Sequence, residues 1–157
     1  MEKNMKARMH FVVLLLIMLG LGAAEGKSGK TLDQLKTEAD AAHGGHQAQL
    51  CSEVALRLVD QAAEHFGGND MTQGHASVQE VAVYAAKARD AALSSRGRLK
   101  EVEINLREAQ RHLDNLKHTL PADERPHLTD VQKIISDYRQ EIQDEMFGVK
   151  KKKEDKK

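Results

Sequence analysis

Residues 78–120 decide the fold of this chain, and they read VQEVAVYAAKARDAALSSRGRLKEVEINLREAQRHLDNLKHTL. Apolar or small side chains recur along this stretch at alternating spacings of three and four residues. That spacing is a heptad repeat, which is typical of a helix that packs along one face against other helices. The repeat consists of Val78, Val81, Ala85, Ala88, Ala92, Ser95, Leu99, Val102, Leu106, Ala109, Leu113, Leu116 and Leu120.

The segment Ser94-Ser95-Arg96-Gly97 is the weak point of this repeat. A glycine inside a helix costs about 1 kcal/mol relative to alanine. The heptad nevertheless keeps its phase across Gly97, which a loop would have no reason to preserve. We therefore expect one continuous helix over residues 77–120, a rod of roughly 65 Å at the usual rise per residue.

Two shorter helices are expected beside this rod, one over residues 31–66 with a kink at Gly44-Gly45 and one over residues 129–147. Three capping boxes, in which Ser or Thr precedes Glu or Gln by three positions, predict where helices begin. Glycine or proline predicts where they end. The boxes are Thr31 with Gln34, Ser77 with Glu80 and Thr129 with Gln132, and the stops are Gly67-Gly68, Pro121 and Gly148.

These patterns predict an all-α fold, an elongated antiparallel helical bundle with one long central heptad helix flanked by two shorter helices. The sequence shows no alternation of apolar and polar residues that would indicate strands. The connection over residues 121–127 is short enough to return the last helix antiparallel along the rod. The helical domain would occupy residues 25–148.

A second, sparser apolar stripe lies away from the main seam of the predicted rod. Its larger members, Val83, Leu93 and Ile104, are candidates for an interaction surface. The stripe could receive residues 31–43 of the same chain, or the equivalent face of a second copy. Self-association or a protein partner is therefore expected on these helical faces.

The first 24 residues have the three parts of a secretory signal peptide. A basic end with Lys3, Lys6 and Arg8 precedes an apolar run over residues 11–21, and small residues lead to a cut after Ala24. The alternative is an uncleaved anchor, although the run is shorter than the roughly 18 apolar residues of a spanning helix. We expect an exported protein, periplasmic or secreted, whose mature chain begins at residue 25.

Charge is distributed unevenly along the chain. Residues 25–149 carry 15 Lys and Arg against 21 Asp and Glu, whereas residues 150–157 carry six Lys against Glu154 and Asp155. An acidic domain disfavours nucleic-acid binding. The tail over residues 149–157 is too charged to fold alone and is expected to be disordered. It is either solubilising or makes weak contact with an anionic surface.

His43 and His46 are candidate metal ligands, because two histidines three residues apart on one helix face often form half of a zinc or copper site. Gly44-Gly45 between them weakens the helix that would hold this geometry, and further ligands could only be guessed from Glu38, Asp40, His65 and His75. Solvent-exposed histidines around a hinge are the competing interpretation.

Cys51 is the single cysteine of the chain and lies beside the apolar positions Leu50, Val54 and Leu58. A lone cysteine in an exported protein can pair with a second chain. Here no basic residue flanks it to lower its pKa, and we expect a small buried apolar residue instead.

The sequence contains none of the common catalytic motifs, neither a Gly-x-Ser-x-Gly elbow, nor His-Glu-x-x-His, nor a glycine-rich phosphate loop. We therefore expect no enzyme and no cofactor. The charged residues Glu101, Glu103, Arg107, Glu108 and Arg111 alternate at helical spacing, which indicates a solvated face.

Residues 128–132, Leu-Thr-Asp-Val-Gln, are similar to the Leu-Thr-x-x-Gln motif of small periplasmic stress chaperones. The resemblance covers five residues and implies a helical protein that shields unfolded clients and in some cases binds zinc. A capping box explains the same letters. The leading hypothesis is an exported non-enzymatic protein-binding or structural module, and the alternative is a periplasmic stress protein with chaperone-like or metal-binding activity.

Overall fold

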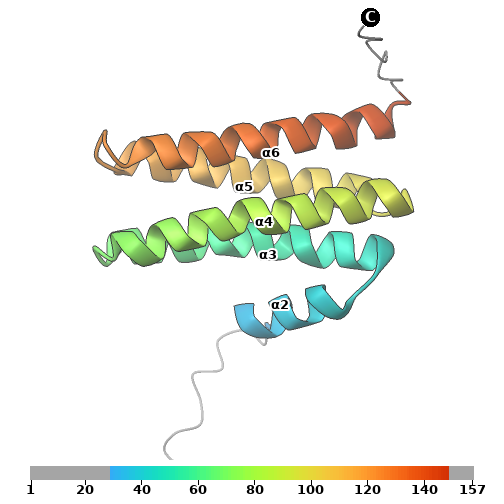
Figure 1. Cartoon of the computed structure of the whole chain (residues 1–157), viewed down its shortest axis with the longest axis horizontal. Helices are drawn as coiled ribbons and strands as arrows, with labels where there is room; N and C mark the ends of the chain where they lie inside the picture. Colours follow the sequence, from blue (N-terminus) through green and yellow to red (C-terminus); the bar gives the residue numbers. More distant parts are fainter. Residues whose placement is uncertain (1–28, 149–157) are drawn as a thin grey trace, which may run out of the picture. The chain divides into compact units, whose positions relative to one another are not determined.

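A computed structural model describes residues 29–148 of the chain. All regular structure in this range is helical (Figure 1), so the predicted all-α class is confirmed. The predicted signal peptide, residues 1–24, and the Lys-rich tail, residues 149–157, lie outside the described residues. The helices are α2 (Leu32–Ala41), α3 (Gly44–Gly67), α4 (Met71–Ser95), α5 (Leu99–Thr119) and α6 (Arg125–Met146).

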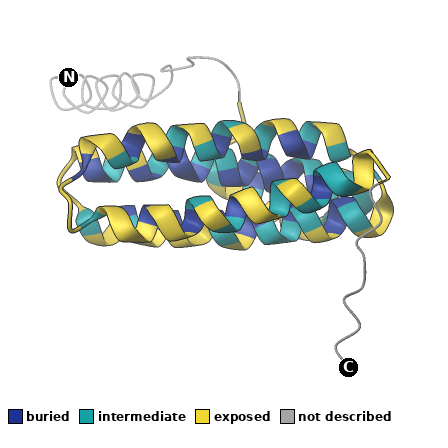
Figure 2. Cartoon of the chain, turned by 90° about the horizontal axis from the view of Figure 1, so that it is seen from above, coloured by how far each residue is buried: buried dark blue, intermediate teal, exposed yellow. Residues whose placement is uncertain are grey.

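Helices α3 to α6 form a four-helix bundle around one apolar core. The pairs α3–α4 and α5–α6 are antiparallel hairpins, and the two hairpins pack together through α3 on α5 and α4 on α6 (Figure 1). The consecutive helices α4 and α5 make few contacts, because they occupy diagonal corners of the bundle. As a result, α3 and α5 are neighbours that run in the same direction. Buried residues follow the inward faces of the helices (Figure 2).

The predicted continuous helix over residues 77–120 is wrong. Helix α4 ends at Ser95 and α5 begins at Leu99, and Arg96 and Arg98 adopt left-handed φ angles of 51° and 59° that reverse the chain. The heptad positions on both sides, such as Ala92 and Val102, are nevertheless fully buried. Each helix turns its own apolar face to the shared core. The unchanged phase of the heptad repeat therefore does not show whether one helix continues through residues 96–98.

The first predicted helix is also divided. Helix α2 ends at Ala41 and α3 begins at Gly44, so the break falls at residues 42–43, just before the predicted kink. Gly44 has a φ of +59°, which a glycine adopts without strain. The next residue, Gly45, lies directly against Gly97 of the α4–α5 turn. The two chain reversals at this end of the bundle therefore interlock through glycines.

One of the three predicted capping boxes is confirmed. The hydroxyl of Thr31 accepts from the N–H of Gln34, whose side chain in turn accepts from the Thr31 N–H. The other two boxes are wrong, because α4 begins six residues before Ser77 and α6 begins four residues before Thr129. Both residues lie inside helices, where the Ser77 hydroxyl donates to Gln61 and the Thr129 hydroxyl donates to the carbonyl of Arg125.

Residues 71–74, which closely follow the predicted helix end at Gly67-Gly68, form the first turn of α4. Asp70 caps this helix, since its carboxylate accepts from the N–H of Gln73. Gly74 lies within the helix against the ring of Phe66, and a Cβ at this position would come within 2.6 Å of a ring carbon. This glycine therefore allows α3 and α4 to approach closely, which is a packing role rather than a turn.

Helix α2 lies outside the four-helix bundle and packs on α3. Its buried residues Leu35 and Ala39 join the common core. Asp40 accepts from the hydroxyl of Tyr84 at 3.2 Å and from Lys87 at 2.6 Å, and both of these residues belong to α4. All buried core residues of the described range lie between Leu35 and Ile142, so a chain of residues 25–157 contains the whole of this folding unit.

Candidate functional site

An open groove between the parallel helices α3 and α5 is the candidate functional site. It has a volume of about 600 Å³. Its apolar residues are Val59, Ala63, Phe66, Leu116 and Leu120. Gly67 and the polar side chains of Asp60, His112, Asn115 and Thr119 complete the lining. An apolar floor beside convergent polar groups is the usual composition of a protein or ligand docking site.

The polar side of the groove is fixed by contacts between its two helices. Nδ1 of His112 on α5 lies 3.0 Å from Oδ1 of Asp60 on α3. Outside the groove lining, the side-chain amide of Asn105 on α5 donates to the buried hydroxyl of Ser52 on α3 at 2.9 Å. This hydrogen bond also joins α5 to α3. Because polar groups tie the two helices together, the groove is a preformed feature of the packing.

The groove ends at an aromatic cluster that joins three elements. Phe66 of α3 meets His75 of α4 edge-on, with ring centroids 5.2 Å apart, and His75 meets His127 of α6 at 4.9 Å. Nε2 of His75 also lies 2.5 Å from the Glu124 carboxylate. The second ring nitrogen of His75 is buried, and no described residue pairs with it. This cluster closes one end of the bundle and positions Phe66 in the groove floor.

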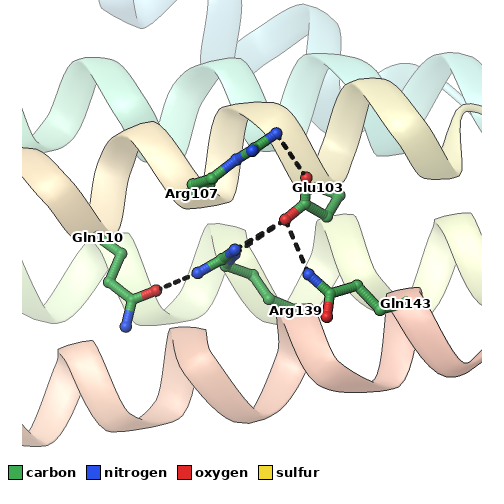
Figure 3. Close-up of polar contacts among 5 residues, drawn as sticks. All are labelled: Glu103, Arg107, Gln110, Arg139 and Gln143. Atoms are coloured by element: carbon green, nitrogen blue, oxygen red, sulfur yellow. Dashed lines mark hydrogen bonds and ion pairs between the residues drawn. The ribbon is translucent and has the colours of Figure 1, made fainter.

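A second polar cluster lies between α5 and α6 (Figure 3). One carboxylate oxygen of Glu103 accepts from Arg139 at 2.8 Å and from Gln143 at 3.0 Å, and the other accepts from Arg107 at 3.0 Å. Arg139 also donates to the side-chain oxygen of Gln110 at 2.6 Å. Glu103 is buried, so the prediction that this residue belongs to a solvated face is wrong.

The environment of Glu103 favours its ionised form. Burial by itself would raise the pKa of this carboxyl, but the hydrogen bonds from Arg139 and Gln143 and the charges of Arg139 and Arg107 outweigh it and lower the pKa. A carboxylate that is ionised at neutral pH and saturated by donors is a poor proton acceptor. The cluster therefore acts as a clamp that fixes the register of α6 on α5.

A shallower polar hollow of about 550 Å³ runs past this clamp. It is lined by Arg107, Arg111, Lys133 and Arg139 together with Asp114 and uncharged polar residues. Arg107 and Arg139 are bound to Glu103, and Arg111 is bound to Glu108. Since these guanidinium groups are engaged by the carboxylates of Glu103 and Glu108 on α5, the hollow offers less positive charge than its residue types suggest.

His43 and His46, the predicted metal ligands, lie exposed on either side of the start of α3. Two of the guessed further ligands are engaged elsewhere, since Asp40 binds Lys87 and His75 lies against Glu124. Within residues 29–148, no three His, Cys, Asp or Glu side chains gather in a way that could hold a metal ion. Among the residues that the structure describes, no metal-binding group therefore forms around this histidine pair.

Cys51 is fully buried in the core, as expected for a small apolar residue. Burial is the main cause that raises the pKa of its thiol to about 11. The charge of Lys87 lowers this pKa by a smaller amount, and the charge of Asp40 raises it slightly. The thiolate is the reactive form of cysteine, so this thiol is shielded by both position and protonation.

The predicted interaction surface does not form one continuous stripe, because the helix that would carry it is broken at residues 96–98. Val83 on α4 and Ile104 on α5 are exposed, by 52% and 38%. Leu93 is half-buried and packs against the core. These residues are therefore separate surface positions on two diagonal helices.

No protein-family model matches the chain, and comparisons with curated proteins and with solved structures found no significant match. Within the described range, no helix is both long and apolar enough to cross a membrane.

Sequence reasoning missed both the groove and the Glu103 clamp. The groove arises where α3 and α5 run side by side, and a prediction that joined α4 to α5 in one rod could not bring these helices together. The clamp joins residues 36 and 40 positions apart in the chain. The sequence held a weak signal for the clamp. Glu103 directly follows the core position Val102, and Arg107 lies one helical turn further along the same helix.

Proposed function

We propose that this chain is an exported, non-enzymatic helical module that binds a protein partner through the groove between α3 and α5. The observation that carries the proposal is the composition of this groove, in which Val59, Phe66 and Leu116 form an apolar floor. Burying such a floor under a partner's apolar side chains is favourable, since each Å² of apolar surface removed from water contributes about 25 cal/mol.

A helical segment is the form of partner that suits this groove best. Two parallel helices leave a straight channel between them, and an amphipathic helix can lay its apolar face into such a channel. Asp60 and Asn115 stand at the channel's polar edge and can hydrogen-bond to the polar side of the same helix. The proposal of export rests on the sequence of residues 1–24 alone.

The alternative, a periplasmic stress protein, has a different basis. It rests on Leu128–Gln132, and the structure gives these residues packing roles. Leu128 is fully buried. The side chain of Gln132 accepts from Lys117 and donates to Asp114, so it joins α6 to α5. Packing between α5 and α6 therefore accounts for the residues of this motif without a chaperone activity.

Photo-crosslinking from the groove tests the proposed function. Ala63 lines the groove and is exposed, so a photoreactive phenylalanine analogue there leaves the core intact. Ala76 is exposed on α4, outside the groove lining, and is the matched control. In cells that make the protein, we expect a discrete protein adduct from position 63 and none from position 76.

A blocking substitution completes this experiment. Asn115→Arg places a long side chain over the groove from an exposed position of α5. It should abolish the adduct formed from position 63 while leaving the melting temperature unchanged. Adducts of equal yield from positions 63 and 76, or an adduct that survives Asn115→Arg, would overturn the groove as the docking site.

A further inference from the structure

One wall of the groove between α3 and α5 carries two carboxylates that form no ion pair with a Lys or Arg of the described range. Asp60 lines the groove, and Glu64 stands one helical turn after it, three positions before the lining residue Gly67. Both acidic residues are exposed. The described partner of Asp60 is the imidazole of His112 at 3.0 Å, which is positively charged only when it is protonated. Asp60 and Glu64 together are called the acidic rim below.

The basic side chains beside the acidic rim are engaged by other groups. Arg57 of α3 forms an ion pair with Glu53, one turn earlier on the same helix. Arg111 of α5 forms an ion pair with Glu108. Arg125 lies at one end of the groove, where its guanidinium donates at 2.9 Å to the carbonyl of the lining residue that follows α5. The acidic rim therefore keeps its negative charge along the α3 wall.

The opposite wall of the groove does not balance this charge. The polar residues that α5 contributes to the lining are His112, Asn115 and Thr119. The amide and the hydroxyl do not ionise, and at a pH where the imidazole is neutral the wall carries no charge. A helix that lies in the groove would therefore meet an acidic edge on α3 and an uncharged polar edge on α5.

The position of Glu64 does not favour the stability of its own helix. Glu64 lies in the last turn of α3, which ends at Gly67, and the C-terminal end of a helix carries a partial negative charge that repels a carboxylate. Because α3 and α5 run in the same direction, the C-terminal ends of both helices lie at this end of the groove (Figure 1). A cation supplied by a partner would be attracted both to Glu64 and to these helix ends.

We propose that the partner helix of this groove is cationic, with apolar side chains on one face and Lys or Arg along the edge that meets α3. This inference rests on the proposed function and adds the chemistry of the partner to it. Asp60 and Glu64 are four residues apart, about 6 Å along the helix axis, so two basic side chains one turn apart on the partner can pair with both. The apolar face of the same helix would lie on the groove floor.

A cationic helix uses more of the groove than other helices would. An uncharged amphipathic helix could lie on the floor but would leave the acidic rim without a partner. An acidic helix would be repelled, since like charges that face each other across an interface disfavour binding. The acidic rim would therefore select the partner, and the floor would supply the apolar contact.

Three synthetic peptides test the inference by fluorescence anisotropy. Each is an amphipathic helix of about 18 residues with the same leucine and alanine face, and its polar face carries Lys, Gln or Glu. The protein is the chain of residues 25–157 at about pH 7.5, where free imidazoles are mostly neutral, in about 0.05 M salt. We expect the Lys peptide to bind about tenfold more tightly than the Gln peptide, and the Glu peptide to bind more weakly than either.

Two double variants locate the effect of charge. Asp60→Asn combined with Glu64→Gln removes the acidic rim and should make the Lys and Gln peptides bind equally. Asp130→Asn combined with Asp137→Asn is the matched control, because it removes as many charges from exposed positions of α6 outside the groove lining. This control should bind the Lys peptide like the parent chain. Thermal unfolding followed by circular dichroism would show that both variants are folded.

The groove and the charge of its partner can fail separately in this experiment. Asn115→Arg should abolish binding of the uncharged Gln peptide, and binding that survives this substitution would overturn both proposals. Equal binding of the Lys and Gln peptides to the parent chain, blocked in each case by Asn115→Arg, would overturn the cationic partner and leave the groove as a docking site. A Lys preference that survives the loss of the acidic rim, or no binding of any peptide, would also overturn the cationic partner, whereas crosslinking from position 63 tests the groove itself.

Discussion

The backbones of Gly45 and Gly97 are in direct contact across the end of the bundle. A Cβ placed on Gly97 would lie 3.1 Å from the Cα of Gly45, and a Cβ placed on Gly45 would lie 3.3 Å from the Cα of Gly97. Both separations are shorter than ordinary van der Waals contact. The α4–α5 turn and the start of α3 therefore approach as closely as they do because neither position carries a side chain.

Gly97→Ala should destabilise the protein. The added methyl group meets backbone on one side and the Ser95 hydroxyl on the other, so the turn must shift. We expect a loss of about 1–3 kcal/mol in the free energy of unfolding, as for overpacked cores. Urea unfolding of the chain of residues 25–157 would measure it.

Gly67→Ala is the matched control for this prediction. Gly67 is the last residue of α3, and a Cβ there would meet no atom within 4 Å. Alanine should be neutral or stabilising by up to about 1 kcal/mol, because it favours helix more than glycine does. Equal effects of the two substitutions would show that the glycine contact does not limit packing.

Leu106→Ala tests the core assigned to α5. Leu106 is fully buried, whereas Ile104, two residues earlier on the same helix, is 38% exposed. Truncating a buried leucine costs about 2–5 kcal/mol, through lost burial and the cavity left behind. We expect a loss in this range for Leu106→Ala and a much smaller one for Ile104→Ala in the same urea titration. A larger loss at position 104 would mean that α5 is rotated about its axis.

Glu103→Gln should weaken the clamp between α5 and α6. At pH 7 the amide cannot replace the charge that holds Arg139 and Arg107, and we expect a loss of about 1–3 kcal/mol. Because the folded pKa of Glu103 lies below its ordinary value of 4.5, ionised Glu103 contributes its stability above that pH. This contribution is lost as the pH falls through the folded pKa.

The pH dependence gives this prediction a specific signature. The difference in unfolding free energy between the parent chain and Glu103→Gln should be constant above pH 5 and shrink below the ordinary pKa. Glu108→Gln is the control, since Glu108 pairs with Arg111 in an exposed position and such pairs contribute about 0–1 kcal/mol. A difference that grows in acid would contradict the assignment.

Cys51 should be inert in the folded protein. With a pKa of about 11 and no exposure, its thiolate is scarce and inaccessible at pH 8. We expect Ellman's reagent to modify it at least about a hundredfold more slowly in buffer than in guanidinium chloride. A disulfide-linked dimer of the folded protein on a non-reducing gel would contradict this prediction.

The sequence predicted the burial of the apolar repeat well, because period and residue type report which face of a helix is covered. Val78, Ala85, Leu106 and Leu113 are all fully buried. The prediction of a continuous helix failed at Gly97, because four helices of similar length can share one core only if the chain reverses direction between them. That requirement belongs to the whole assembly, and the heptad phase is satisfied either way.

The polar contacts were harder to foresee, for a related reason. A Ser or Thr that precedes Glu or Gln by three positions occurs inside helices as well as at their starts, so Ser77 and Thr129 misled the assignment of helix ends. Asp70, the actual cap of α4, has a conventional capping side chain, but a search for Ser or Thr at the first position of a capping box passes over an aspartate. The Glu103 clamp depends on a partner in α6, which local spacing cannot reveal.

The diagonal step from α4 to α5 has a consequence for how the chain can be divided. Each hairpin is contiguous in sequence, and the turn at residues 96–98 is the single covalent link between them within the described range. Two separately expressed fragments, ending at residue 96 and beginning at residue 98, should therefore find each other and coelute as a complex. The bundle is in effect two helical hairpins joined by one short turn. Such a protein is suited to use as a split reporter.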